Sequence, residues 1–177
     1  TYEKGKPVTP LKETGDTDET GTCIRFYPDP EIFEEIVFEK EIIIQRLREL
    51  SFLNRGLKIT FTDYREEEPV QKVLHYSGGL RDFVVYVNKK KDVINTEPVY
   101  FEKKKDDVIV QAAVQYNTGY NENLYSFANN IRTQEGGTHE VGFKNALTRV
   151  VNEYAKKNNL IKENDANLSG EDIREGM

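Results

Sequence analysis

The sequence is poor in the residues that bind metals or cross-link a chain. Among its 177 residues there is one cysteine, Cys23, and there are two histidines. A single cysteine excludes an internal disulfide and is typical of a protein that resides in a reducing cytoplasm. So few soft ligands also argue against a zinc site. We therefore predict a cytoplasmic protein with no metal site in this chain, in which Cys23 is a small buried hydrophobe.

Long apolar runs and phosphate-binding loops are missing too. No stretch approaches the roughly eighteen apolar residues of a membrane span, and nothing resembles a secretory signal. Neither a GxxxxGK[ST] nor a GxGxxG pattern occurs, and the pairs at 78–79 and 136–137 are too short to cradle a phosphate. His75 and His139 have no serine or cysteine nucleophile in a recognisable setting. We expect no catalytic residue in this chain.

Charge is plentiful and its balance is acidic. The net charge is -6, with 32% charged and 37% hydrophobic residues, which is typical of a soluble globular protein. An acidic chain does not bind nucleic acid through its overall electrostatics, so any DNA contact would need a local basic patch. The length suits one domain, or one domain plus a piece of another.

Hydrophobic periodicity alternates between helices and hairpins. It predicts about five strands and three helices, in the order helix, hairpin, helix, hairpin, strand, helix. The expected helices cover 39–54, 77–88 and a long stretch from 138; the expected strands cover 57–63, 72–76, 99–103, 108–116 and 124–131. Hairpins interleaved with helices favour an α+β fold, a two-layer sandwich with a mixed sheet and helices on one face. Before these elements, residues 21–28 form a short β-like run, and we expect 1–33 to have no core of its own.

The stretch from 124 to 157 is the most regular part of the chain. A strand over 124–131 is followed by a polar turn over 132–137 and then by a helix with Thr138 as N-cap. Glu140 places a negative charge in the first turn, where the helix dipole favours it. One apolar stripe is expected along this helix: Phe143, Leu147, Val150, Val151 and Tyr154.

The C-terminal residues resemble the start of a further helix. Ser169 is a plausible N-cap, with Glu171 and Asp172 in the first turn. A helix begun there reaches barely two turns by Met177. We therefore expect this sequence to be a fragment of a longer protein.

Several long runs carry a resemblance to a known family. They are GTCIRFYPDPEIF (21–33), RLRELSFLNRGLKITFTD (46–63), HYSGGLRDFVVYVNKKK (75–91), QYNTGYNENLYSFANNIRTQEGGTHEVGFKNALTRVVNEYAKKNNL (115–160) and SGEDIREGM (169–177). In these runs the chain closely resembles the B-type subunits of bacterial type II topoisomerases, namely that of DNA gyrase and its topoisomerase IV counterpart. Another GHKL ATPase, of the mismatch-repair or heat-shock type, is the alternative family, but it would not be expected to carry EGGTHEVGF or RELSFLN.

The resemblance implies a position within a multidomain protein. Residues 1–33 resemble the C-terminal strands of the GHKL ATPase domain, and residues 34–177 resemble most of the transducer domain, without its final strand and its lysine-bearing loop. The family's transducer has a ribosomal-protein-like β-α-β fold with a left-handed crossover. Such crossovers are normally right-handed, so periodicity alone would not have indicated this one.

The resemblance also implies the activity of the intact protein, an ATP-hydrolysing DNA topoisomerase, which is an isomerase. ATP and Mg²⁺ are its cofactors, and ATP closes two B-type subunits into a gate. The expected partners are double-stranded DNA and an A-type subunit, in a heterotetramer of two A and two B subunits, with no membrane. The transducer couples gate closure to strand passage. This fragment alone is expected to be inactive and to bind neither cofactor.

Two sets of residues are the candidate binding sites. The first follows from the resemblance: Thr22 matches a residue that hydrogen-bonds the adenine region, Gly21 allows close approach, and Ile24 lines the pocket wall. The alternative is that Thr22 is an ordinary strand residue that does not contact the nucleotide. The second set, Arg132, Lys144 and Arg149, comes from charge: these cations could face captured DNA, or could serve only surface solubility.

Overall fold

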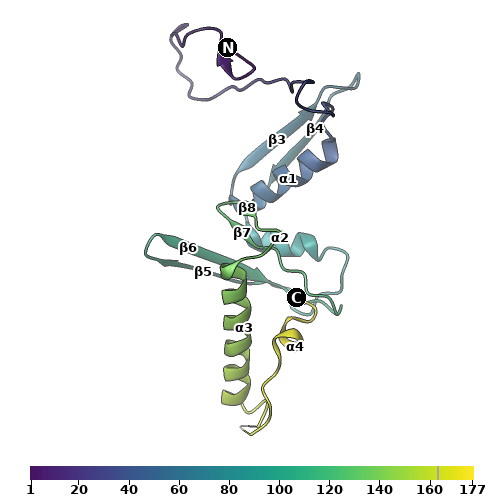
Figure 1. Cartoon of the computed structure of the whole chain (residues 1–177). Coiled ribbons are helices and arrows are strands. Elements are labelled where there is room, and N and C mark those ends of the chain that lie inside the picture. The colour runs from purple at the N-terminus through teal and green to yellow at the C-terminus, as the bar shows by residue number, and fades with distance from the viewer. Residues whose placement is uncertain (163) are drawn as a thin grey trace. The chain divides into compact units, whose positions relative to one another are not determined.

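The structure is a computed structural model that describes residues 1–162 and 164–177. The chain divides into two compact units, Thr1–Lys40 and Glu41–Met177. Figure 1 labels the helices and the strands from β3 onward. The division lies seven residues beyond the boundary expected at residue 33. The identity of the two parts as an ATPase end and a transducer stays a prediction.

The first unit contains little regular structure. Its two short strands, β1 (Tyr2–Glu3) and β2 (Lys6–Pro7), form a hairpin whose turn residues Lys4 and Gly5 have φ values of 48° and 77°. Residues 21–28 form no strand, which contradicts the β-like run expected there. Cys23 is exposed, so its expected burial is wrong. The reason is the same for both: no described strand pairs with this segment to cover it.

The second unit begins with a helix and a hairpin. Helix α1 (Lys40–Leu53) precedes strands β3 (Lys58–Asp63) and β4 (Val70–His75), which pair antiparallel with Ile59 opposite Leu74. The elements match the expected ones within two residues at most boundaries. Periodicity predicts that Ile43, Leu47 and Leu50 share the apolar face of this helix. The structure instead buries Ile44 and Phe52, beside that face.

Phe52 is the centre of the second unit's core. Its side chain is 1% exposed. Its ring stacks on Tyr76 at 3.8 Å between centroids and contacts Phe83 at 5.3 Å and Tyr86 at 5.5 Å. Phe83 in turn meets Phe127 edge-on at 6.0 Å. Aromatic pairs of this kind contribute about 0.5–1.5 kcal/mol each beyond the area they bury. The cluster joins four segments: α1, the residue after β4, residues 80–87 and residues 127–128.

Helix α2 (Leu80–Val87) begins differently from the prediction. Its N-cap is Gly79 with φ 62°, without a side-chain cap. The sequence had indicated Ser77, at the start of the expected helix 77–88, as the N-cap, and this prediction is wrong. The carboxylate of Asp82 accepts a hydrogen bond from the Gly78 amide at 2.8 Å instead. A left-handed turn at Gly79 starts the helix two residues later, and Asp82 supplies the negative charge that the first turn favours.

Two more hairpins follow. Strands β5 (Val99–Lys105) and β6 (Val108–Val114) pair antiparallel, and α2 packs against them. Strands β7 (Phe127–Ala128) and β8 (Ile131–Arg132) replace the single strand expected over 124–131. The chain reverses at Asn129 and Asn130, whose φ values are 47° and 67°. Asparagine tolerates this left-handed geometry, so the Asn-Asn pair was the turn signal that the prediction missed.

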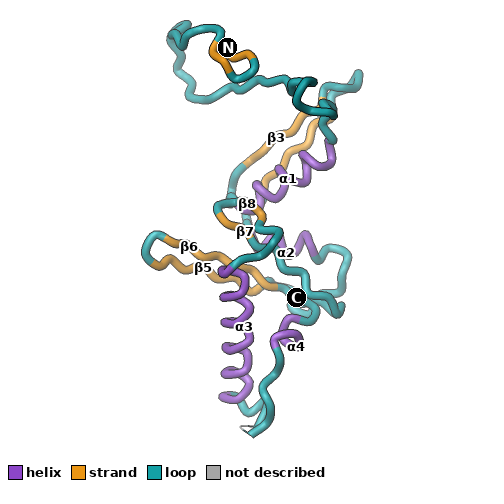
Figure 2. The backbone as a smooth tube through the Cα atoms, in the orientation of Figure 1, coloured by secondary structure: helices purple, strands orange, loops and turns teal. Residues whose placement is uncertain are grey.

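The mixture of helices and strands confirms the α+β fold class. Within the described residues the strands form four two-stranded antiparallel sheets rather than one mixed sheet (Figure 2). Each strand pairs with its sequence neighbour across a short turn, and no further strand of the described chain joins one hairpin to the next. Since the left-handed crossover requires a parallel pair, it stays a prediction.

Helix α3 (Thr138–Lys157) is preceded by Gly137, which takes the N-cap position expected for Thr138. The stripe predicted along it is only partly correct. Phe143, Leu147 and Val151 are half-buried, but Val150 and Tyr154 are 55% and 61% exposed. Its buried positions are Asn152 and Ala155. The helix turns a polar side toward its neighbour because that neighbour is helix α4 (Gly170–Arg174), not an apolar sheet.

Asn152 fixes the segment that leads into α4. Its Nδ2 donates to the Leu168 carbonyl oxygen at 3.0 Å, and the Leu168 amide donates to its Oδ1 at 2.8 Å. One residue later Ser169 caps α4, as expected. Its Oγ accepts from the Asp172 amide at 3.1 Å, and its own amide donates to the Asp172 carboxylate at 2.9 Å. This reciprocal pair is a capping box.

We expect Asn152→Ala to lower the free energy of unfolding by about 1–3 kcal/mol, because it leaves two backbone groups of Leu168 without their partners. Asn145→Ala, at an exposed position of the same helix, is the matched control and should change stability by less than about 0.5 kcal/mol. Urea unfolding followed by circular dichroism measures both. Equal midpoints for the two variants would contradict the anchoring role of Asn152.

Candidate functional site

The residues expected at an adenine site lie in the first unit. Gly21, Thr22 and Ile24 are all exposed, Ile24 to 81%. A Cβ added at Gly21 would meet no atom within 4 Å. The described residues therefore form no cradle around this segment, and they offer one edge of a binding site at most.

The three cations expected to face DNA lie in three different settings. Arg132 lies in β8, with its guanidinium 4.8 Å from the centroid of the Tyr125 ring. Lys144 lies in α3 and is held by two carboxylates. Arg149 follows Lys144 by five residues, which places it about 140° around the helix. Its side chain is 72% exposed, with Glu153 at 3.9 Å.

The part of the chain that the structure describes contains neither a metal-binding cluster nor a membrane-spanning helix. Within residues 1–162 and 164–177, no group of three or more His, Cys, Asp or Glu side chains could hold a metal ion. None of the helices described there has the length and apolarity that a membrane crossing requires.

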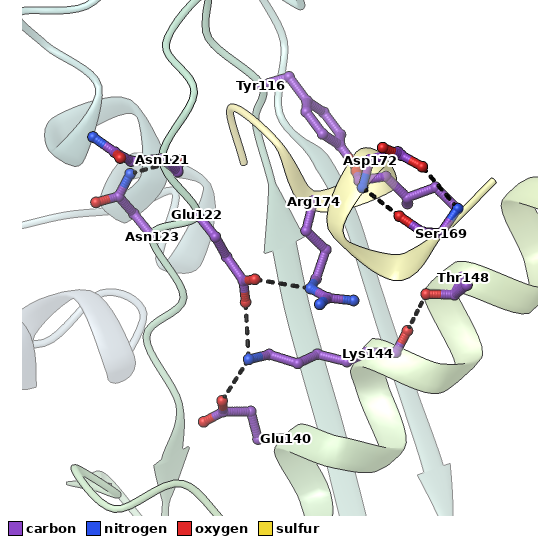
Figure 3. A network of polar contacts seen from close by, with 11 residues as sticks. Tyr116, Asn121, Glu122, Asn123, Glu140, Lys144, Thr148, Ser169, Asp172 and Arg174 are labelled. Atoms are coloured by element: carbon purple, nitrogen blue, oxygen red, sulfur yellow. Dashed lines mark hydrogen bonds and ion pairs between the residues drawn. The ribbon is translucent and has the colours of Figure 1, made fainter.

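What the structure gathers instead is a network of four charged side chains from three segments (Figure 3). Glu122 comes from the loop before β7, Glu140 and Lys144 from the first two turns of α3, and Arg174 from α4. Lys144 Nζ lies 2.9 Å from Glu122 Oε1 and 3.0 Å from Glu140 Oε1, and Arg174 Nε lies 2.9 Å from Glu122 Oε2. We call these four residues the charged network. Two carboxylates balance two cations, so it has no net charge.

Partial burial leaves these ion pairs less screened by solvent and salt than ordinary surface pairs. Their side chains are between 14% and 29% exposed. Burial raises the pKa of the Glu122 carboxyl, but the hydrogen bonds from Lys144 and Arg174 outweigh it, and the pKa falls below its ordinary 4.5. Hydrogen bonds from Lys144 and Ser126 lower the pKa of Glu140, and those to Glu122 and Glu140 raise the pKa of Lys144. All three groups are therefore charged at neutral pH.

Hydroxyl groups extend the charged network into the polar loop at 132–137. Ser126 Oγ donates to Glu140 Oε2 at 2.9 Å and lies 2.6 Å from Thr133 Oγ1. Thr133 Oγ1 in turn lies 3.1 Å from His139 Nε2. An open cavity of about 320 Å³ adjoins these groups, lined by Leu124, Ser126, Arg132, Thr133, Gln134, Glu135, Gly136 and Glu140.

On its other side the charged network meets the C-terminal residues. The Asn117 backbone amide and its Nδ2 both donate to the Gly176 carbonyl oxygen at 2.8 Å. The Asn123 amide donates to the Met177 carbonyl at 2.7 Å, and Tyr116 Oη donates to the Ile173 carbonyl at 2.7 Å. Gly176 has φ 74°, and a Cβ there would collide with the Asn117 carbonyl oxygen. Only glycine fits this close approach.

Most of the charged network was not predicted from the sequence. The Glu140–Lys144 pair could have been found, because residues four apart on a helix face each other. The Glu122–Arg174 contact joins residues 52 positions apart, and no local pattern in the sequence indicates it.

We expect the contribution of Glu122 to depend on pH. Because its folded-state pKa is lowered, its stabilisation is present above the ordinary pKa of 4.5 and is lost as the pH falls through the lowered value. Glu122→Gln should therefore lower the unfolding free energy by about 1 kcal/mol at pH 7, and by progressively less as the pH falls below 4.5. Urea unfolding at both pH values tests this. Glu153→Gln, at an exposed pair, should have no effect, and a pH-independent loss in Glu122→Gln would contradict the role of its charge.

Comparison with known proteins identifies related chains. A family model described as DNA gyrase B matches residues 79–177. The chain is 56% identical to a DNA gyrase B subunit from Clostridium acetobutylicum over 100% of its own length, but it spans only 28% of that protein. A DNA gyrase B subunit from Bacillus cereus is 54% identical over 99% of this chain and 44% of the relative.

Solved structures agree with these relatives. The 43K ATPase domain of Thermus thermophilus gyrase B, in complex with an aminocoumarin, matches 84% of this chain and 40% of its own, with a TM-score of 0.73 and 36% identity. The B-subunit of the DNA gyrase from Myxococcus xanthus matches 72% of this chain and 36% of its own, with a TM-score of 0.67 and 30% identity. The resemblance carried by the sequence runs is thus confirmed, and the chain belongs to the DNA gyrase B family.

Proposed function

We propose that this chain joins the nucleotide-binding and transducer parts of an ATP-dependent type II topoisomerase of the gyrase B kind, and that it couples ATP binding to DNA strand passage. The observation that carries the proposal is the 56% identity to a gyrase B protein over the whole chain, which includes both of its units. In this proposal residues 1–33 are the last strands of the ATPase domain and residues 34–177 are most of the transducer.

The structure of each unit suits such a role. The first unit has exposed apolar side chains and needs other residues to cover it, as the end of a larger domain would. The second has its own aromatic core and a charged network that ties α3 to α4. A body held together in this way can move as one piece, which a coupling element requires.

The cofactors and partners belong to the proposed intact protein. ATP and Mg²⁺ would be its cofactors, and an A-type subunit, a second B-type subunit and double-stranded DNA its partners. The described residues include no metal-binding cluster. Thr22 would hydrogen-bond the adenine region, with Gly21 and Ile24 beside it, and we expect the isolated chain not to hydrolyse ATP.

Thr22→Val in the intact protein tests the adenine contact. The substitution keeps the shape of the side chain and removes its hydroxyl, so we expect ATP affinity to fall about 2- to 10-fold, the effect of losing one hydrogen bond. Thr14→Val, at another exposed threonine of the same unit, is the control and should leave affinity unchanged. Isothermal titration with a non-hydrolysable ATP analogue measures both. Equal affinities would rule out the contact.

A second candidate function, contact with DNA, is favoured by one observation. Arg132 is exposed and lies at the rim of the open cavity, held over the Tyr125 ring. A cation fixed in this way can meet a phosphate with little loss of side-chain entropy. Lys144 is less suited, because both of its ion pairs would have to break, and Arg149 belongs to a different part of the helix surface.

We therefore expect Arg132→Glu in the intact protein to weaken the stimulation of ATP hydrolysis by DNA, with a reduced dependence on salt. Lys104→Glu, on the exposed β5–β6 hairpin, changes the net charge equally and is the matched control. Arg149→Glu tests the third candidate separately. If Arg132→Glu and Lys104→Glu reduce stimulation to the same extent, total charge is responsible and contact through Arg132 is ruled out.

A further inference from the structure

The charged network lies between two segments that are far apart in sequence, the polar loop at 132–137 and the C-terminal segment at 169–177. We propose that Glu122 is a positioning residue that couples these segments, so that a change in the conformation of one alters the stability of the other. The coupling would be one means of relaying motion through the transducer, and in this respect it rests on the proposed function.

The position of Glu122 allows it to serve both segments at once. Its Oε1 pairs with Lys144 at 2.9 Å and its Oε2 with Arg174 at 2.9 Å. Each oxygen thus has a different cation, from a different helix (Figure 3). A glutamine cannot replace it, because its amide group has one acceptor oxygen and would turn an NH₂ group toward a cation.

Toward the loop, contacts continue without a break. Lys144 is shared between Glu122 and Glu140, and Glu140 accepts a hydrogen bond from Ser126. Ser126 contacts Thr133 within the loop twice, through the two hydroxyl groups at 2.6 Å and through its carbonyl oxygen, which accepts from the Thr133 amide at 2.9 Å. A movement of the loop that withdraws Ser126 from Glu140 changes how Glu140 competes for Lys144.

Toward the C-terminus, Arg174 sets the position of α4. Its side chain is 14% exposed, and its guanidinium lies close to Gly170, where a Cβ would be 2.6 Å from Nη1. The turn that follows is bonded to the same loop that carries Glu122, through Asn117 and Asn123. Loss of the Glu122–Arg174 pair would therefore loosen α4 and the residues after it together.

The shared cation, Lys144, makes the contacts of the two segments depend on each other instead of holding each segment independently. Lys144 places one positive charge between two carboxylates. When one carboxylate withdraws, the ammonium can move toward the other, so the two pairs depend on each other. Perturbations at the two ends should then be non-additive, which independent contacts would not produce.

Hydrogen–deuterium exchange in the intact protein tests the proposal. Glu122→Gln should raise the exchange rates of both 132–137 and 170–177 about threefold or more. Ser126→Ala leaves Glu122 and Arg174 unchanged. It should raise the exchange rates of the loop at 132–137 and should also change the exchange rates of 170–177. In the double variant Glu122→Gln/Ser126→Ala, the exchange rates of 170–177 should equal those of Glu122→Gln alone. Glu153→Gln, at an exposed pair of the same helix, should alter neither segment.

Three results would overturn the coupling: faster exchange only in 170–177 for Glu122→Gln, no response of 170–177 to Ser126→Ala, or additive effects in the double variant. The Ser126→Ala result stands even if Glu122→Gln does not fold. DNA-stimulated ATP hydrolysis of the same variants separates this inference from the proposed function. Coupled exchange with unchanged ATPase stimulation supports the coupling and counts against a role in energy transduction.

Discussion

The second unit depends on the burial of Phe52. At this ring α1, the residue after β4 and helix α2 all meet, and through Phe83 the cluster reaches β7. Arg46 of α1 adds a polar tie, donating to the Asn130 carbonyl oxygen at 2.7 Å across 84 residues of sequence. The left-handed turn at Asn129 and Asn130 is thus held against α1 from one side and against the aromatic cluster from the other.

Polar contacts, rather than aromatic packing, hold the C-terminal segment of the second unit in place. There the segment after residue 167 is attached to α3 by Asn152 and to the loop at 116–123 by backbone hydrogen bonds. The buried asparagines Asn88 and Asn117 are bonded to each other, with Asn117 Nδ2 donating to Asn88 Oδ1 at 3.3 Å. Among the described residues no buried side-chain polar atom lacks a hydrogen-bond partner. Such contacts have strict geometry, so they specify one arrangement of α4 where apolar packing would allow several.

Helix α3 links the polar loop to this C-terminal region. Its first two turns carry Glu140 and Lys144 of the charged network, and its later turns carry Asn152, which binds Leu168 ahead of α4. Its exposed apolar residues Val150 and Tyr154 lie on a different side.

The sequence by itself determined what depends on neighbouring residues: the three main helices, the two long hairpins, the Ser169 cap and, through its long runs, the family. These follow from periodicity, capping and turn chemistry, which act over a few positions. Tertiary structure decided the rest. Cys23 is exposed because no described strand covers it, the strands remain in separate pairs because no further described strand joins them, and the apolar stripe of α3 is only half-covered because Asn152 binds its neighbour. Glu122 and Arg174 came together only in three dimensions, since an ion pair between residues 52 positions apart depends on how the chain folds back.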